Sequence, residues 1–141
     1  MATGTGDKKA LLVTVITPAR QVLSQEAGFL LVPASDGEMG IQPGHAAMVA
    51  ALGTGLLRID TLDGAKKFIA VRGGFLQVKK GEANVLTQEA VAGEEVDAAK
   101  VGAEVTALEA QSGGDNKPKP ETREALAWAR AKQKANTARK G

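Results

Sequence analysis

Hydrophobic and polar residues follow two different patterns along this chain, and the change between them falls near residue 93. Before it, hydrophobic residues come in short runs, and alternation is clearest where Leu76 and Val78 share one face while Phe75 and Gln77 share the other. These runs predict β-strands at 11–16, 28–32, 56–60, 66–71, 75–79 and 83–87. Gly, Pro and Asp turn signals separate them at intervals of roughly 8 to 12 residues or a little more, which is typical of a β-sandwich or barrel.

After residue 93 the composition changes to Ala, Glu and Lys, which are strong helix formers. Val101, Val105 and Leu108 recur at the i, i+4 and i+7 positions of a helix and form a narrow apolar stripe. This pattern predicts a helix over about 95–111, which Gly113 and Gly114 end.

A second helix is predicted over about 120–138, because Pro120 suits a first helical turn. Its stripe of Trp128, Ala131, Ala135 and Ala138 is small enough to pack closely on the first helix. The loop 112–119 joins the two helices into a hairpin. Few large side chains are available to dock this hairpin on the strands, so we expect it to be weakly held and mobile.

Charge is segregated within the hairpin. Residues 94–124 carry eight acids and four bases, whereas residues 125–141 carry five bases and no acid. An acidic first helix attracts a basic second helix when the two fold back on each other. The alternative is an ordinary solvated helix end, whose bases complement the negative pole of the helix dipole.

The overall composition limits the possible functions. With 141 residues the chain forms one domain or a small domain with an appendage, and its few aromatic residues predict an aliphatic core. A net charge of +2 excludes the uniformly basic surface of many nucleic-acid-binding proteins. The absence of cysteine excludes disulfides and thiol chemistry. Residues 1–9 are polar and expected to be flexible, and no apolar run approaches the roughly 20 residues that cross a bilayer, so no membrane insertion is expected.

The segment DGEMGIQPGH, residues 36–45, contains the only histidine of the chain, and four of its ten residues are Gly or Pro. Its backbone path is strongly constrained, which suits a shaped loop against which a partner docks. Catalysis is not favoured, because Ser24, Asp36 and His45 have no nucleophile elbow, and Asp36 with Glu38 more often solvates a turn. We therefore expect a protein that is not an enzyme, with no catalytic residue, metal site or cofactor.

Short motifs along the chain also recur in the order and spacing of one protein family. They are Thr17-Pro18, Val22, Ser24, Leu31-Val32-Pro33, Asp36-Gly37-Glu38, Gly40-Ile41, Pro43-Gly44-His45-Ala46, Leu57-Arg58-Ile59, Val71, Gly73-Gly74-Phe75 and Val85-Leu86. The loop at 36–46 and the Gly-Gly-Phe motif are together the most specific. On these residues, over most of 11–138, the chain resembles the epsilon subunit of bacterial F-type ATP synthase, the equivalent of the mitochondrial delta subunit.

The resemblance implies a β + α fold: a flattened β-sandwich of about ten strands over residues 1–93, then an antiparallel α-helical hairpin over residues 94–141. It implies a non-catalytic rotor subunit of the proton-translocating synthase. Its partners are then the gamma subunit, the c ring and, through the hairpin, the alpha/beta catalytic hexamer. The implied location is peripheral, on the cytoplasmic face of the bacterial inner membrane. The absence of an Arg- and Ser-rich presequence favours this bacterial setting over an organellar one.

The same resemblance implies roles for particular residues. Those expected to face the polar loops of the c ring are Glu38, Met39, Ile41, Gln42 and His45. In the family the second helix extends into the catalytic hexamer and blocks ATP hydrolysis by approaching an acidic segment of the beta subunits. The candidates for that inhibitory contact are Arg123, Arg130, Lys132 and Lys134.

Some family members bind ATP at the start of the first helix, where this chain has Asp97 and Lys100. Lys100 replaces an arginine of that motif, Val101 replaces an alanine, and Ala107 stands where another arginine is found. A lysine cannot reproduce the bidentate contact of an arginine with phosphate, which argues against nucleotide binding.

An alternative function stays open at this point. The chain is then a stand-alone β-sandwich binding module whose basic helical tail binds RNA or an acidic partner. Three Phe and one Trp offer little aromatic surface for stacking bases, which weighs against this interpretation.

Overall fold

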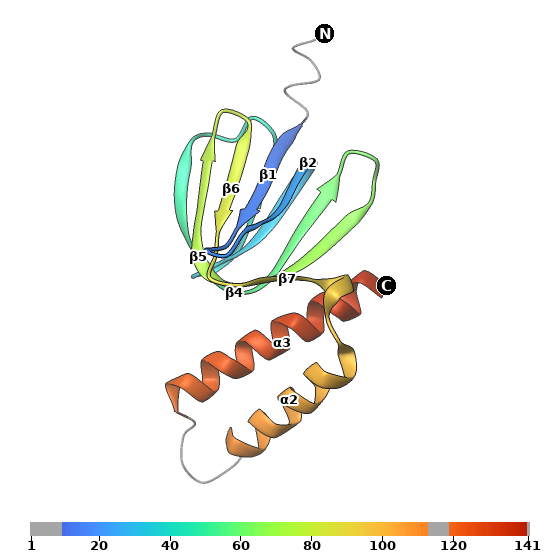
Figure 1. The fold of residues 1–141 in the computed structure, drawn as a ribbon. Coiled ribbons are helices and arrows are strands. Elements are labelled where there is room, and N and C mark those ends of the chain that lie inside the picture. The colour runs from blue at the N-terminus through green and yellow to red at the C-terminus, as the bar shows by residue number, and fades with distance from the viewer. Residues whose placement is uncertain (1–9, 113–118, 141) are drawn as a thin grey trace.

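The computed structural model describes residues 10–112 and 119–140, with strands in the first part of the chain and helices in the second (Figure 1). The strands are β1 (Leu11–Ile16), β2 (Gln21–Ala34), β3 (Gly37–Ile41), β4 (Met48–Thr61), β5 (Lys66–Lys79), β6 (Glu82–Leu86) and β7 (Ala90–Ala92). A 3-10 turn, η1 (Gly93–Glu95), precedes the helices α2 (Ala98–Ser112) and α3 (Pro120–Lys140). The flexibility expected for 1–9 and most of the loop expected at 112–119 concern residues outside the described ranges.

The strands close on themselves. The sheet order is β1-β6-β5-β4-β2-β3, and β1 also pairs with β2. Strand β1 runs parallel to β6 and antiparallel to β2. Five strands therefore form a closed ring, to which β3 adds beside β2 and β7 adds beside β5. This strand body followed by two helices confirms the predicted β + α class.

Alternation along the strands fills the interior with aliphatic side chains. On β1, Leu11, Val13 and Val15 are fully buried, whereas Leu12 between them is exposed. The core cluster consists of aliphatic residues without an aromatic ring, as the composition predicted. Burial of this apolar surface is the main term that stabilises the strand body, at roughly 25 cal/mol per Å².

The described residues form seven strands instead of the ten or so expected, and three of the seven are long. Strands β2, β4 and β5 have 14 residues each. Strand β5 passes through Gly73 and Gly74, with φ of 64° and 110°, and joins the two strands predicted at 66–71 and 75–79. A Cβ on Gly74 would lie 1.8 Å from the carbonyl oxygen of Leu86, so only glycine fits where the strand bends.

The helices begin and end at slightly different residues from those predicted. Helix α2 begins at Ala98 rather than near residue 95, because residues 93–95 form the 3-10 turn. The Asp97 carboxylate accepts the backbone N–H of Lys100 at 3.1 Å and so caps the helix. Helix α3 begins at Pro120, as predicted, and continues past residue 138 to Lys140.

Helix α3 lies between the strand body and α2 (Figure 1). Its stripe of Trp128, Ala131 and Ala135 packs against Ala70 of the sheet. The prediction that this stripe packs on the first helix was wrong. Small side chains allow the helix backbone to approach the strand body closely. This approach is so tight that a Cβ on Gly93 would lie 2.4 Å from the carbonyl oxygen of Ala135.

The other side of α3 contacts α2. Leu126 and Ala129 of α3 pack against the buried Val101 and Val105 of α2. The apolar stripe predicted on the first helix therefore does form the hairpin contact, with different residues of the second helix opposite it. Over the described residues, neither helix has the length and hydrophobicity needed to cross a bilayer. Within the same ranges, His, Asp and Glu side chains do not gather in groups of three that could hold a metal ion.

Candidate functional site

The segment predicted as a docking loop consists of strand β3 followed by a turn, and its candidate contact residues differ in exposure. Glu38 and Gln42 are exposed. Met39 is partly buried and packs on the core, and Ile41 is fully buried beside Leu30 of β2. Ile41 is therefore not a surface contact in this structure, which corrects its assignment. The alternation of the strand turns its side chain inward.

His45 is half-buried and lies at the end of a tight turn. Its backbone N–H donates to the carbonyl of Gln42 at 3.0 Å, and Gly44 has a φ of 86°. The ring Nδ1 lies 2.8 Å from the carbonyl oxygen of Ala46, so this geometry assigns the proton to Nδ1. In the neutral ring Nε2 is then the acceptor for a partner. Among the five predicted contact residues, Glu38, Gln42 and His45 carry the polar side chains.

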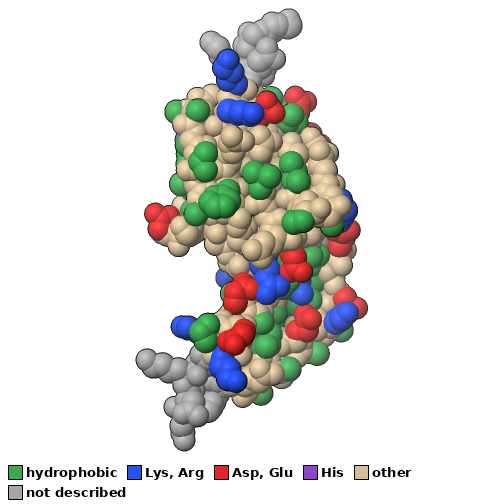
Figure 2. Space-filling model, turned by 60° about the vertical axis from the view of Figure 1, so that its left-hand side comes forward, with side chains coloured by type: hydrophobic (Ala, Val, Ile, Leu, Met, Phe, Trp, Pro, Cys, Tyr) green, Lys and Arg blue, Asp and Glu red, His purple; other side chains and the backbone are tan. Residues whose placement is uncertain are grey.

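A second surface is a row of apolar side chains across the outer face of the β1-β6-β5-β4 sheet. The strand registers place Ile16 beside Leu86, Leu86 beside Phe75, and Phe75 beside Ala51. We call these four residues the apolar row. Phe75 is 57% exposed and Leu86 is 43% exposed. Figure 2 shows hydrophobic side chains gathered over the strand half of the molecule. Exposed apolar patches of this kind mark interaction sites.

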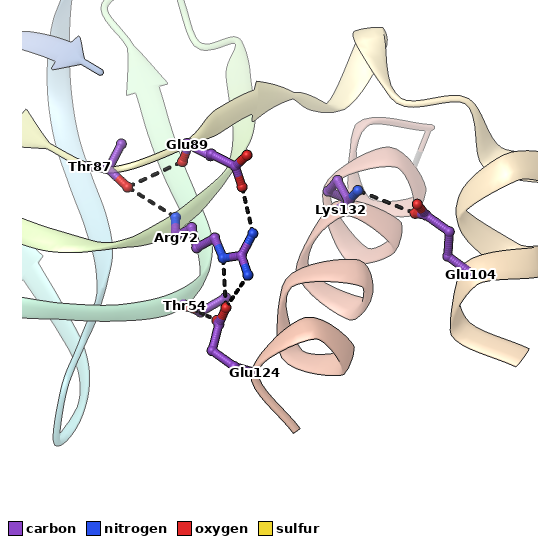
Figure 3. A network of polar contacts seen from close by, with 7 residues as sticks. All are labelled: Thr54, Arg72, Thr87, Glu89, Glu104, Glu124 and Lys132. Carbon is purple, nitrogen blue, oxygen red and sulfur yellow. Dashed lines mark hydrogen bonds and ion pairs between the residues drawn. The ribbon is translucent and has the colours of Figure 1, made fainter. Parts of the chain in front are cut away.

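The contact between α3 and the strand body contains a polar network centred on Arg72 (Figure 3). Its Nε donates to Glu124 of α3 at 2.6 Å, and its Nη1 donates to Glu89 at 2.7 Å. The hydroxyl of Thr54 donates to the other oxygen of Glu124 at 3.0 Å. The hydrogen bonds to Glu89 and then to Glu124 raise the pKa of Arg72. The guanidinium also lies 5.8 Å from the ring centroid of Trp128, within cation–π range.

The C-terminal half of α3 has its own polar anchor. Asn136 is 4% exposed. Its Nδ2 donates to the carbonyl oxygen of Gly93 at 3.1 Å and to that of Val96 at 3.3 Å. Helix α3 is therefore held at one point by Arg72 and, three turns later, by the segment that connects the strands to the helices.

The candidate inhibitory residues on α3 divide into two pairs. Arg130 pairs with Glu109 of α2 at 2.8 Å, and Lys132 pairs with Glu104 of α2 at 3.3 Å. These ion pairs favour the attraction between an acidic first helix and a basic second helix over the alternative of an ordinary solvated helix end. The side chains of the other two candidates are exposed: Arg123 and Lys134.

The residues at the expected nucleotide position have structural explanations. The carboxylate of Asp97 is occupied as the cap of α2. Lys100 is exposed in the first turn of that helix, and Val101 is buried in the hairpin contact. This arrangement shows no fork of donors that matches a phosphate group.

Sequence reasoning did not single out Arg72, Glu124 or Asn136. Arg72 and Glu124 are 52 positions apart, and Asn136 is 43 positions from Gly93. Of these three residues, only Asn136 could have been noticed from its type. An amide side chain in an Ala-rich helix is costly to bury unless hydrogen bonds satisfy it.

Comparison with known proteins matches one family model, and the similar solved structures include the following two. A family model described as "ATP synthase, Delta/Epsilon chain, beta-sandwich domain" matches residues 10–93, which include all seven described strands. A chain of the Euglena gracilis mitochondrial ATP synthase, solved by cryo-EM as an OSCP/F1/c-ring assembly, is similar with a TM-score of 0.78 and 24% identity. The match covers 94% of this chain and 82% of that chain.

The second structure is a chain from the central stalk and c ring of the Tetrahymena thermophila mitochondrial ATP synthase. Its TM-score is 0.54 at 16% identity, over 94% of this chain and 98% of that chain. At these identities the two structures establish a shared fold. Their coverage extends beyond the strand body that the family model matches.

Proposed function

The chain belongs to the ATP synthase delta/epsilon chain family, and on that premise we propose that it is a non-catalytic central-stalk subunit of a proton-translocating F-type ATP synthase. It joins the gamma subunit to the c ring, and its hairpin inhibits ATP hydrolysis. The family match over the complete strand body carries this proposal. The two similar structures support it, since both are described as parts of ATP synthase assemblies that include the c ring.

We assign the apolar row to the gamma subunit. Ile16, Phe75 and Leu86 also line a hollow of about 380 Å³ whose lining residues are all uncharged. An aromatic side chain beside an uncharged hollow fits a partner surface that stays bound, because the core of such interfaces is depleted in charged residues and enriched in aromatic ones. Burial of the 57% of Phe75 that is exposed contributes about 1–2 kcal/mol.

We assign the segment after β2 to the c ring. Glu38, Gln42 and His45 offer a carboxylate, an amide and an imidazole from a backbone that β3 and the following turn hold in place. Groups positioned in advance bind polar loops with little loss of conformational entropy. Met39 adds partial apolar contact. Ile41 contributes from inside by anchoring the strand in the core.

We assign the inhibitory contact to the cations of α3. Arg130 and Lys132 are bound to acids of α2 in this arrangement, so they become available to another partner only after the two helices separate. Together with Arg123 and Lys134, they then approach an acidic segment of the beta subunits. In this proposal the folded hairpin is the arrangement that permits hydrolysis.

We place the protein peripherally, on the cytoplasmic face of a bacterial inner membrane, and bound there through the c ring. Nucleotide binding is not included in the proposal, because the carboxylate of Asp97 caps α2 and Lys100 provides no bidentate donor.

The rotor assignment is tested by affinity purification of the tagged full chain from a membrane fraction. We expect gamma and c subunits to co-purify. Phe75→Asp places a charge in the apolar row and should release gamma. Gln77→Asp is the matched control, because it places the same charge at an exposed position two residues along the same strand. Recovery of RNA, or of no synthase subunit, would refute the assignment.

The inhibitory role has a separate test. A chain ending at Gly113 lacks α3 and should raise the ATP hydrolysis rate of the assembled synthase. An unchanged rate would refute inhibition by the hairpin while leaving the rotor assignment in place.

A further inference from the structure

Among the residues that the structure describes, strand β7 is paired along one edge only. Its residues 90–92 pair antiparallel with residues 69–71 of β5. The N–H of Arg72 donates to the carbonyl of Glu89 at 3.0 Å. The backbone N–H and C=O of Glu89 and, by alternation, those of Val91 therefore point toward β5. The backbone groups of Ala90 and Ala92 therefore point to the opposite edge.

That opposite edge is partly open. The N–H of Ala92 has a local partner in the carboxylate of Glu95, at 3.4 Å. Over residues 10–112 and 119–140, no strand pairs with the N–H and C=O of Ala90 on this side. An unpaired strand edge is a template for a further strand, and recognition by strand addition uses such edges.

A groove follows the open edge, between β7 and the turn that joins β1 to β2. Two hollows of about 220 and 360 Å³ lie along it and share Arg20 and Val22. The larger one is lined by Ala90 and also shares Thr17 and Gln88 with the hollow beside the apolar row. The concave surface is therefore continuous from the apolar row to β7.

The charges along the groove favour an acidic group in the occupant. Arg20 is exposed, and its guanidinium forms no ion pair with any residue of the described ranges. Lys66 and Lys67 line the same hollow, and each already has a polar partner. Two acids, Glu94 and Glu95, also line this hollow, and the carboxylate of Glu95 accepts the N–H of Ala92. The larger hollow is also lined by Glu89, which pairs with Arg72, and by Lys132, which pairs with Glu104. Arg20 is thus the cation available to a partner carboxylate.

We propose that an extended segment of the gamma subunit, carrying a carboxylate that meets Arg20, adds to the open edge of β7 as a further strand. This inference rests on the proposed function. Gamma is the occupant because the groove continues from the surface assigned to it. The added strand bonds to the N–H and C=O of Ala90. Since β7 runs directly into η1, where the Gly93 carbonyl binds Asn136, this strand also lies next to an anchor of α3.

The test compares amide hydrogen exchange in the full chain alone and in its co-purified complex with gamma. We expect the Ala90 amide to exchange about tenfold or more slowly in the complex, because it gains a hydrogen bond. The Val91 amide is the internal control, since its bond to β5 exists in both states.

A variant gives a second readout. Ala90→Pro removes the N–H that faces the groove and leaves the β5 side intact, and proline is tolerated on edge strands. We expect gamma to bind about tenfold more weakly, by loss of one hydrogen bond and of strand fit. Arg20→Ala should weaken binding in the same direction at low salt. Lys79→Ala, an exposed cation at the far end of β5, is the matched control and should leave gamma binding unchanged.

The outcomes separate the two proposals. If gamma binds and the Ala90 amide exchanges equally fast with and without it, strand addition is overturned while the rotor assignment stands. If wild-type chain does not bind gamma at all, the proposed function fails and this inference with it. Protection of Ala90 that grows with protein concentration in the absence of gamma means that a second copy occupies the edge, which also overturns the inference. The exchange experiment on wild type decides even if Ala90→Pro does not fold.

Discussion

Replacing Glu124 with alanine tests how strongly α3 is held on the strand body. Both oxygens of this carboxylate are bound, one by Arg72 at 2.6 Å and the other by Thr54 at 3.0 Å. The side chains of Arg72 and Glu124 are 31% and 43% exposed. Their pair is therefore worth more than the roughly 0.2–1 kcal/mol of an exposed ion pair and less than the 3–5 kcal/mol of a buried one. We expect Glu124→Ala to weaken docking of α3 by about 1–2 kcal/mol, a factor of roughly 5–30.

The chain carries its own reporter for this experiment. Trp128 is the only tryptophan, and it is 8% exposed at the contact between α3 and the sheet. When α3 leaves the sheet, acrylamide quenching of its fluorescence should increase and its emission should move to longer wavelength. Glu121→Ala is the matched control, because it removes an exposed carboxylate about one turn earlier on the same helix.

Salt provides the independent check. Raising ionic strength from about 0.1 to 1 M shortens the Debye length from about 10 to 3 Å. Quenching of the wild type should then move toward that of Glu124→Ala, while the variant itself changes little. Equal quenching of wild type, Glu121→Ala and Glu124→Ala at both salt concentrations would refute the reasoning and would assign docking to the apolar stripe alone.

Three further changes have defined outcomes. Asn136→Ala removes a buried donor to the connecting segment and should lower the free energy of unfolding by about 1–2 kcal/mol, measured by denaturant titration. Gly93→Ala places a Cβ 2.4 Å from a carbonyl oxygen of α3 and should increase Trp quenching, whereas Gly102→Ala, with open space around its Cβ, should not. The hydrogen bond from Thr61 lowers the pKa of Asp63, so this carboxylate stabilises the fold above its unfolded-state pKa, and its contribution is lost as pH falls through the folded-state pKa. Asp63→Asn should therefore make the melting temperature less dependent on pH in that acid range.

The division of the chain and the aliphatic core could be predicted because both depend on local periodicity. Alternation placed Leu76 and Val78 on one face of the strand predicted at 75–79, and the structure buries both side chains. The helical repeat of Val101 and Val105 likewise identified the buried face of α2. Strand β3 was read as a loop because its glycine-rich sequence has little strand propensity, and it forms through pairing with β2.

What could not be predicted depends on contacts between distant residues. Gly73 and Gly74 have the sequence signature of a turn. Whether such a pair reverses the chain or bends a strand depends on the approach of the β6 backbone at Leu86. The stripe that contains Trp128 could pack equally well against a helix or against a sheet. Helix α3 contacts the sheet on one side and α2 on the other, so the sequence did not decide between them. Of the predicted contact residues, Ile41 was misassigned because a loop was assumed where a strand imposes alternation.

The two ionic contacts of α3 meet at one aromatic ring. Trp128 lies 5.8 Å from the guanidinium of Arg72, on the strand body, and 5.4 Å from the ammonium of Lys132, which pairs with α2. The side chain of Lys132 is 18% exposed, whereas that of Arg130 is 50% exposed. Water therefore screens the Arg130–Glu109 pair far more than the Lys132–Glu104 pair. Separation of α2 from α3 and departure of α3 from the sheet therefore both alter the surroundings of Trp128. Each movement removes one of the two cations from the Trp128 ring, so the fluorescence of this side chain should report both movements.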